Sequence, residues 1–177
     1  MKLKQLVLSA IFTVLIIIGT YIKIPLPFIP ITFQVLFVLL AGSLIKFPYA
    51  PLAPFTYMML GLLGVPIFTK GGGFWYIFEK SFGYIIGFVI AAAIMSYLIK
   101  KLKRNILNLT LINIIGVFII YFFGIIYFYM IQNFYIKVSM PIGLVLYYGL
   151  FLTIASDIIA IIISVYISYR FGNKVYD

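Results

Sequence analysis

The sequence predicts an all-α integral membrane protein, folded as a single bundle of six transmembrane helices. Hydrophobic residues make up 66% of the 177 residues and charged residues only 9%, which is far more apolar than a soluble domain. The apolar residues also gather in six runs, most of them close to the length that crosses a bilayer. Clusters of proline, glycine or basic residues separate these runs. Because no internal repeat or linker is visible, we expect one domain over residues 1–177.

The breaks between the runs define each predicted helix in order. After the first run, Pro25, Pro27 and Pro30 predict a short extended connector, since proline removes an amide donor and disfavours helix in the residue before it. Thr32 is the expected N-cap of the second helix. The second and third helices are short, so they must tilt or be shielded by protein. The predicted helices are 3–22, 32–45, 49–63, 82–99, 107–131 and 144–170, with a glycine-rich loop over 65–82.

The basic residues predict the orientation in the membrane. Six spans place both termini on one side, and nine of the 13 basic residues lie on that side. By the positive-inside rule, both termini are cytoplasmic in a bacterial plasma membrane, and the glycine-rich loop faces outward. We expect the first helix to be retained rather than cleaved, because its run lacks a small-x-small cleavage site. The nine are Lys2, Lys4, Lys46, Lys100, Lys101, Lys103, Arg104, Arg170 and Lys174, and the other four are Lys23, Lys70, Lys80 and Lys137.

The composition argues against several classes of function. The sequence has no cysteine and no histidine, and only three acidic residues, so we expect no disulfide, no metal centre and no cofactor. A membrane enzyme is the weakest reading for the same reason. The net charge of +10 reflects basic cytoplasmic loops in a chain of this kind rather than nucleic-acid binding.

Asp157 is the residue that most clearly predicts function. It falls midway along the sixth predicted helix, where a carboxylate costs about 2.5 to 3.5 kcal/mol to insert. Thr153, Asp157, Ala160, Ser164 and Ser168 share one helical face, while the opposite face is aliphatic, so the acid should point into the bundle. Three roles remain open for it: an acceptor for a bound ligand, an interhelical hydrogen-bond anchor, or a proton relay.

Three segments carry a resemblance to a family. They are KIPLPFIPITFQVLFVLLAGSL, YMMLGLLGVPIFTKGGG and FGYIIGFVIAA. Together they resemble the BioY family, the biotin-specific S components of energy-coupling-factor (ECF) vitamin transporters, over about residues 10 to 98. The fifth helix is similar only in hydropathy. The matching residues are Ile24, Pro25, Pro30, Ile31, Thr32, Gln34, Leu60, Gly61, Gly64, Pro66, Phe68, Gly83, Tyr84, Gly87 and Phe88.

The resemblance implies a six-helix S-component fold that captures biotin from outside. It places Asp157 at a substrate-binding aspartate of the last helix. Ala160 stands where the family has a lysine, so either Lys80 or Lys70 takes over that role or the ligand is a related carboxylate such as lipoate. The candidate substrate-binding residues are Asp157, Gln34, Phe68, Gly72, Gly73, Trp75, Lys80, Tyr84 and Thr153.

Each of these side chains also has a simpler alternative. Gln34 could be a partner of the helix N-terminus, and the aromatic residues could form an interfacial belt. The loop lysines could be solvated charges, and Glu79 could pair with its neighbour Lys80. Gly71, Gly72 and Gly73 could form a mobile lid or a flexible loop without ligand contact.

The partners follow from the resemblance and from one missing motif. The sequence contains no phosphate-binding G-x-x-x-x-G-K-[ST] pattern, so uptake against a gradient needs energy from outside the chain. The resemblance implies an ECF T component and two ATPase subunits as partners, besides the lipid bilayer. Ser9, Ala10 and Thr13 on the first helix are the candidate docking residues, although small residues at this spacing also serve ordinary helix packing. A non-transport membrane assembly protein is the remaining alternative.

Overall fold

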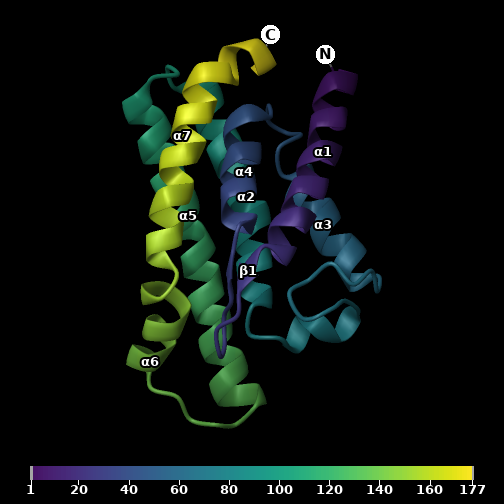
Figure 1. The fold of residues 1–177 in the computed structure, drawn as a ribbon, viewed down its shortest axis with the longest axis vertical. Coiled ribbons are helices and arrows are strands. Elements are labelled where there is room, and N and C mark those ends of the chain that lie inside the picture. The colour runs from purple at the N-terminus through teal and green to yellow at the C-terminus, as the bar shows by residue number, and fades with distance from the viewer. Residues whose placement is uncertain (1, 177) are drawn as a thin grey trace.

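The computed structural model describes residues 2–176, with side chains for residues 2–172. Met1 and Asp177, which the predicted domain includes, and the side chain of Lys174 lie outside the described part. The chain forms one bundle of helices with a short two-stranded ribbon (Figure 1). The elements are α1 (Lys2–Tyr21), β1 (Lys23–Ile24), β2 (Ile31–Thr32), α2 (Gln34–Leu44), α3 (Leu52–Leu62), the 3-10 helix η1 (Phe74–Phe78), α4 (Phe82–Lys101), α5 (Ile106–Met130), the π-helix η2 (Ile131–Tyr135), α6 (Ile142–Leu146), the π-helix η3 (Tyr147–Phe151) and α7 (Ile154–Tyr176).

The first five predicted helices are confirmed, with small changes at their ends. Helix α3 begins at Leu52 instead of residue 49, because Pro51 is its N-cap. Pro54 lies in the first turn of α3, where a backbone amide would have no partner within the helix, so this proline does not interrupt the helix. Thr32 is not the N-cap of α2. Phe33 holds that position without a side-chain capping bond.

The sixth predicted helix is broken, which was not expected. Helix α6 continues into the π-helix η3, Leu152 and Thr153 form a turn, and α7 starts at Ile154. Asp157 therefore lies in the first turn of α7 and not in the middle of a continuous helix. A negative charge near a helix N-terminus interacts favourably with the helix dipole, so the break lowers the cost of burying this acid.

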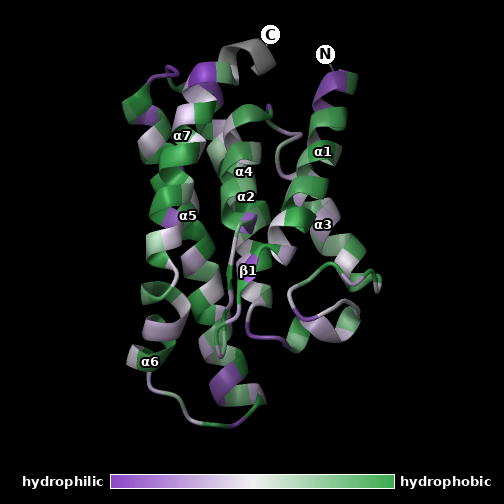
Figure 2. Cartoon of the chain, viewed as in Figure 1, coloured by the Kyte–Doolittle hydropathy of each residue, from purple (hydrophilic) through white to green (hydrophobic). Residues whose placement is uncertain are grey.

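Four helical stretches are long and apolar enough to cross a membrane, judged by length and composition over the described residues: 2–21, 82–101, 106–135 and 142–172. Helices α2 and α3 have 11 residues each, and α2 is buried along most of its length. The helices consist mostly of hydrophobic residues, and many of the hydrophilic ones lie near helix ends (Figure 2). Helix α1 begins and α7 ends at the same end of the bundle (Figure 1).

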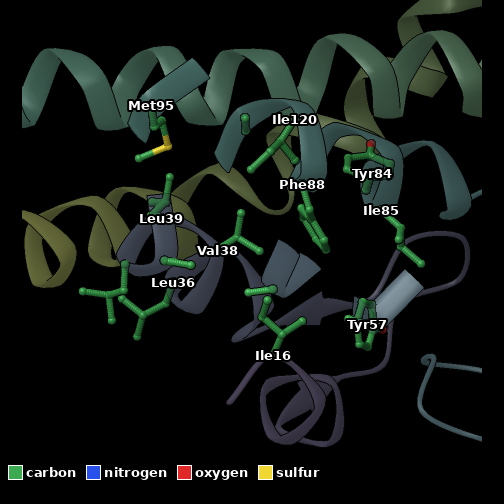
Figure 3. Close-up of a cluster of buried hydrophobic side chains, with 14 of the residues drawn as sticks. Ile16, Leu36, Val38, Leu39, Tyr57, Tyr84, Ile85, Phe88, Met95 and Ile120 are labelled. Atoms are coloured by element: carbon green, nitrogen blue, oxygen red, sulfur yellow. The ribbon is translucent and has the colours of Figure 1, made fainter. Parts of the chain in front are cut away.

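The centre of the bundle is an apolar cluster to which α1 to α5 contribute (Figure 3). Helices α4 and α5 pack closely because their contact contains glycine. A Cβ added at Gly83 would lie 2.2 Å from the Cβ of Tyr127, and one added at Gly87 would lie 2.9 Å from the Cα of Ile120. These two glycines therefore allow the close contact of α4 with α5 inside the bundle.

The connector after α1 forms a ribbon that reaches across the bundle. Lys23 pairs with Thr32, and Ile24 pairs with Ile31. At the tip of the ribbon, the ring of Phe28 lies 5.8 Å from that of Phe128 and 4.8 Å from that of Tyr148, measured between centroids. The tip is thereby held against α5 and the π-helix η3.

Helix α1 packs on the start of α3 and on the turn before it through two small polar residues. Ser9 donates to the carbonyl of Tyr49 over 2.9 Å, and Thr13 donates to that of Ala53 over 3.1 Å. Both side chains are 4% exposed. Ala10 is exposed on the outer face of α1. Of the three predicted docking residues, two thus serve packing within the chain, and Ala10 alone faces outward.

Candidate functional site

A cavity with about 570 Å³ of empty space, part of it open to solvent, lies between the ribbon, the loop before α4 and the inner faces of the helices. The ribbon and the loop before α4, which both contribute to its lining, lie toward the end of the bundle opposite to that where α1 begins and α7 ends (Figure 1). The wall is largely apolar, with polar groups at a few places. The lining residues are Ile29, Pro30, Ile31, Thr32, Gln34, Val35, Tyr57, Thr69, Tyr76, Ser81, Tyr84, Ile85, Phe88, Ile120, Tyr121, Thr153, Ser156 and Asp157.

Asp157 is a buried carboxylate in the wall of this cavity, with 6% of its surface exposed. The phenol of Tyr121 on α5 donates a hydrogen bond to its Oδ2 atom. The other oxygen, Oδ1, has no hydrogen-bond partner among the described residues. A carboxylate held in this way offers an acceptor to a donor group inside the cavity.

The residues around Asp157 hold one another in place. The phenol oxygen of Tyr121 lies 2.8 Å from the hydroxyl of Thr153, and Tyr84 donates to the carbonyl of Gly149 over 2.8 Å. Glycine at position 149 allows this contact, because a Cβ added there would lie 2.7 Å from the hydroxyl of Tyr84 and would displace it. The break before α7 thus provides a backbone carbonyl and close packing that a continuous helix would not.

Gln34 belongs to a second polar group, on another wall of the cavity. Its amide donates to the hydroxyl of Tyr57 over 2.8 Å, and its carbonyl oxygen accepts from Thr32 over 3.2 Å. The hydroxyl of Tyr57 lies 3.2 Å from that of Thr20. These contacts fix the Gln34 side chain, which is 4% exposed. The hydroxyl of Thr32 donates its hydrogen bond to Gln34 and does not cap the N-terminus of α2.

Four of the nine predicted substrate-binding residues line the cavity together. They are Gln34, Tyr84, Thr153 and Asp157. The other five lie in the loop between α3 and α4, outside the lining. The nine predicted residues therefore fall into two groups: four that face the cavity and five that belong to the loop.

Phe68 and the glycines shape the loop. Phe68 is 2% exposed, and its ring packs between those of Tyr57 and Tyr76, with centroids 5.3 and 4.3 Å away. A Cβ on Gly72 would lie 2.1 Å from the carbonyl oxygen of Val65, and Gly73 has a φ of 110°, which favours glycine.

Trp75 and Lys80 lie nearer the outside. Trp75 is 78% exposed. The ammonium of Lys80 lies 4.4 Å from the ring centroid of Phe28, at the tip of the ribbon. Glu79 does not pair with Lys80, as one reading of the sequence expected, but forms a salt bridge of 2.8 Å with Lys70.

Several residues of the cavity were not predicted. Tyr57, Tyr76 and Tyr121 are three of 15 tyrosines in the chain, and Thr69 and Ser81 stand in a loop without an evident pattern. The signal that could have singled out Tyr121 is its distance from the ends of a span, since a phenol in mid-membrane needs a hydrogen-bond partner. Nothing in the sequence identifies Asp157 as that partner.

Comparison with known proteins places this geometry in a family. The sequence model of the BioY family matches residues 1–176. The chain belongs to the BioY family. Among BioY relatives, a probable biotin transporter BioY of Lysinibacillus sphaericus is 36% identical over 94% of this chain and 85% of its own length. The biotin transporter BioY of Thermotoga maritima is 35% identical over 68% of this chain and 76% of its own length.

A solved structure agrees with the BioY assignment. The crystal structure of the S component for biotin from an ECF-type ABC transporter superposes with a TM-score of 0.83 and 28% identity, covering 96% of this chain and 91% of that one. The fold is therefore the six-helix fold of an S component, as the sequence predicts, and this BioY chain is a multi-pass membrane protein.

Proposed function

We propose that this chain is the substrate-capture subunit of an ECF-type vitamin transporter, and that it binds biotin from outside the cell. The observation that carries this proposal is the buried Asp157 carboxylate, which offers Oδ1 as an acceptor at the wall of the cavity. The BioY relatives and the S component with the same fold support biotin as the ligand. The chain acts as a transporter subunit and not as an enzyme.

The chemistry of biotin fits the two kinds of wall in the cavity. Its ureido ring carries two N–H donors, and a carboxylate accepts such donors in charge-assisted hydrogen bonds about twice as strong as neutral ones. Its thioether ring is apolar and suits the aliphatic and aromatic wall made by Val35, Ile85, Phe88 and Ile120. The proposed contacts with the ligand come from Asp157, Thr153, Tyr84 and Gln34. The other predicted residues contribute through the shape or charge of the loop between α3 and α4, namely Phe68, Gly72, Gly73, Trp75 and Lys80.

Lipoate is the second candidate, because the absence of a lysine at Ala160 favours a different ring-bearing carboxylate. Lipoate has an apolar ring and a carboxylate but no N–H donors. It would leave Oδ1 of the Asp157 carboxylate without a hydrogen-bond donor, with Tyr121 as the only donor to the acid among the described residues, and an incompletely paired buried charge is costly. Asp157 therefore favours biotin over lipoate.

The orientation and the partners complete the proposal. With both termini in the cytoplasm of a bacterial cell, the cavity lies in the outward half of the single domain, where it can take up external ligand. An ECF T component and two ATPase subunits would supply the energy, and Ala10 on the outer face of α1 is the remaining docking candidate.

Binding of radiolabelled biotin to the purified chain tests the function. We expect the chain to retain biotin, and excess unlabelled lipoate to displace it far less effectively than excess biotin. Stronger displacement by lipoate would support the second candidate. Retention of neither compound would contradict a capture role and favour a membrane assembly protein.

A further inference from the structure

Three hydroxyls form a row in the cavity wall, away from the group around Asp157. The hydroxyl of Tyr76 lies 2.8 Å from that of Thr69 and 3.0 Å from that of Ser81. All three residues line the cavity, and they come from the loop between α3 and α4. Phe68 packs against the ring of Tyr76 from behind, with centroids 4.3 Å apart.

One hydroxyl hydrogen of the row makes no hydrogen bond within it. Three hydroxyls carry three hydrogens, and the two hydrogen bonds within the row use two of them. Among the described residues, no further partner accepts the third. Burial raises the pKa of the Tyr76 phenol above its ordinary value, so Tyr76 stays a neutral donor. A carboxylate consists only of acceptors, and it is therefore the natural complement of such a row.

The charges around the row favour an anion. Lys23 donates to the backbone carbonyl of Thr69 over 2.5 Å, and Lys80 directly precedes Ser81. Lys70 is neutralised by its salt bridge with Glu79. The excess charge beside the row is therefore positive, whereas the separate hydrogen-bonded group around Asp157 contains a carboxylate.

We propose that the hydroxyls of Thr69, Tyr76 and Ser81 are the subsite that receives the carboxylate of the ligand, with Lys80 as the nearby cation. This inference rests on the proposed function and adds the second end of the site. A ligand with N–H donors at one end and a carboxylate at the other then spans the cavity between two polar groups. It also explains how the chain binds an acid without a lysine at Ala160.

The test compares biotin with its methyl ester, which keeps both rings but lacks the negative charge. We expect Tyr76→Phe to weaken biotin binding about tenfold, the effect of one lost hydrogen bond to a charged group, and to change ester binding less than about twofold. Ser81→Ala should show the same selectivity. Tyr166→Phe is the matched control, because Tyr166 is 67% exposed on α7 and lies outside the cavity lining.

Each outcome decides a different point. Equal losses for biotin and its ester in both variants would show that the row only holds the loop in place, and would overturn the inference. Unchanged biotin affinity would also overturn it. Failure of the unmodified chain to bind either compound would instead contradict the proposed function itself. Thermal unfolding of each variant identifies any loss of affinity that comes from a loss of fold.

Discussion

Tyr121 on α5 donates a hydrogen bond to Oδ2 of Asp157 on α7, so the carboxylate is held from one side and left available on the other. The same phenol lies 2.8 Å from the hydroxyl of Thr153, at the turn that precedes α7. Both side chains are buried, with 7% of Tyr121 and 6% of Asp157 exposed. The position of the acid thus depends on a partner from another helix and on the break in its own.

Replacing Asp157 with asparagine should weaken biotin binding by about 10- to 100-fold, because the ureido N–H groups lose a charged acceptor. Equilibrium binding of labelled biotin to the purified variant measures this loss. Ser164→Ala is the matched control, since Ser164 lies on the same face of α7 and does not line the cavity. Unchanged affinity in the Asp157 variant would refute the assignment of the site.

Tyr121→Phe should weaken biotin binding by a smaller factor, about fivefold, because the carboxylate remains but loses one of the groups that orient it. If Tyr121 acts through Asp157, the double variant with Asp157→Asn should bind no worse than Asp157→Asn alone. Dissociation constants for both single variants and the double variant give this comparison. Fully additive losses would show that Tyr121 acts independently of the acid.

The sequence predicted the polar face of the last helix better than its backbone. Thr153, Asp157, Ala160, Ser164 and Ser168 are all buried, as their helical spacing indicates. The break at residues 152–153 could not be predicted, because that segment contains no proline and π-helical turns lack a clear sequence signature. The π-helix before the break makes a tertiary contact that the sequence does not reveal, since Gly149 lies against the hydroxyl of Tyr84 and accepts its hydrogen bond.

The loop between α3 and α4 also depends on tertiary contacts that the sequence does not reveal. Its glycines indicated an unusual backbone, and the structure gives Gly71 and Gly73 positive φ angles. Which side chains of this loop would face the cavity depended on how the loop folds back. Trp75 points outward although aromatic residues suit an apolar ring, and Tyr76, the next residue, faces inward.

The affinity for biotin should fall as the pH rises through the lowered pKa of Lys80. Burial lowers the pKa of Lys80 below its ordinary 10.5, with a further decrease from nearby Lys70 and an opposing effect of Glu79. Below this lowered pKa, Lys80 is protonated and attracts the ligand's carboxylate. Above it, the charge is lost and the dissociation constant rises. Since the pKa of Tyr76 is raised, that phenol does not lose its proton in the same range.

Binding measured over a series of pH values checks this expectation. Lys80→Met should bind biotin more weakly at neutral pH, with an affinity that changes little as the pH rises. Biotin methyl ester should show the same flat profile with the unmodified chain. An equally steep pH dependence in the Lys80 variant would assign the effect to another group.

Gly83→Ala should destabilise the bundle by about 1 to 3 kcal/mol, the usual cost of overpacking. The added Cβ would lie 2.2 Å from the Cβ of Tyr127 and 2.7 Å from the carbonyl oxygen of Phe123, so α4 and α5 would have to separate. Thermal unfolding in detergent measures the change. Gly143→Ala is the matched control, because a Cβ there has no atom within 4 Å. Equal stability of the two variants would contradict the close packing of α4 on α5.

A bulky side chain on the outer face of α1 should impair docking of the ECF module without changing ligand binding. Ala10 is exposed, whereas Ser9 and Thr13 are buried against the turn before α3 and the start of α3. Ala10→Phe should therefore leave biotin affinity unchanged but reduce the amount of ECF module that copurifies with the chain. Ile114→Phe, on an exposed position of α5, controls for a bulkier membrane surface, since Ile114 is 49% exposed. Undiminished copurification with the Ala10 variant would remove this face of α1 from the docking surface.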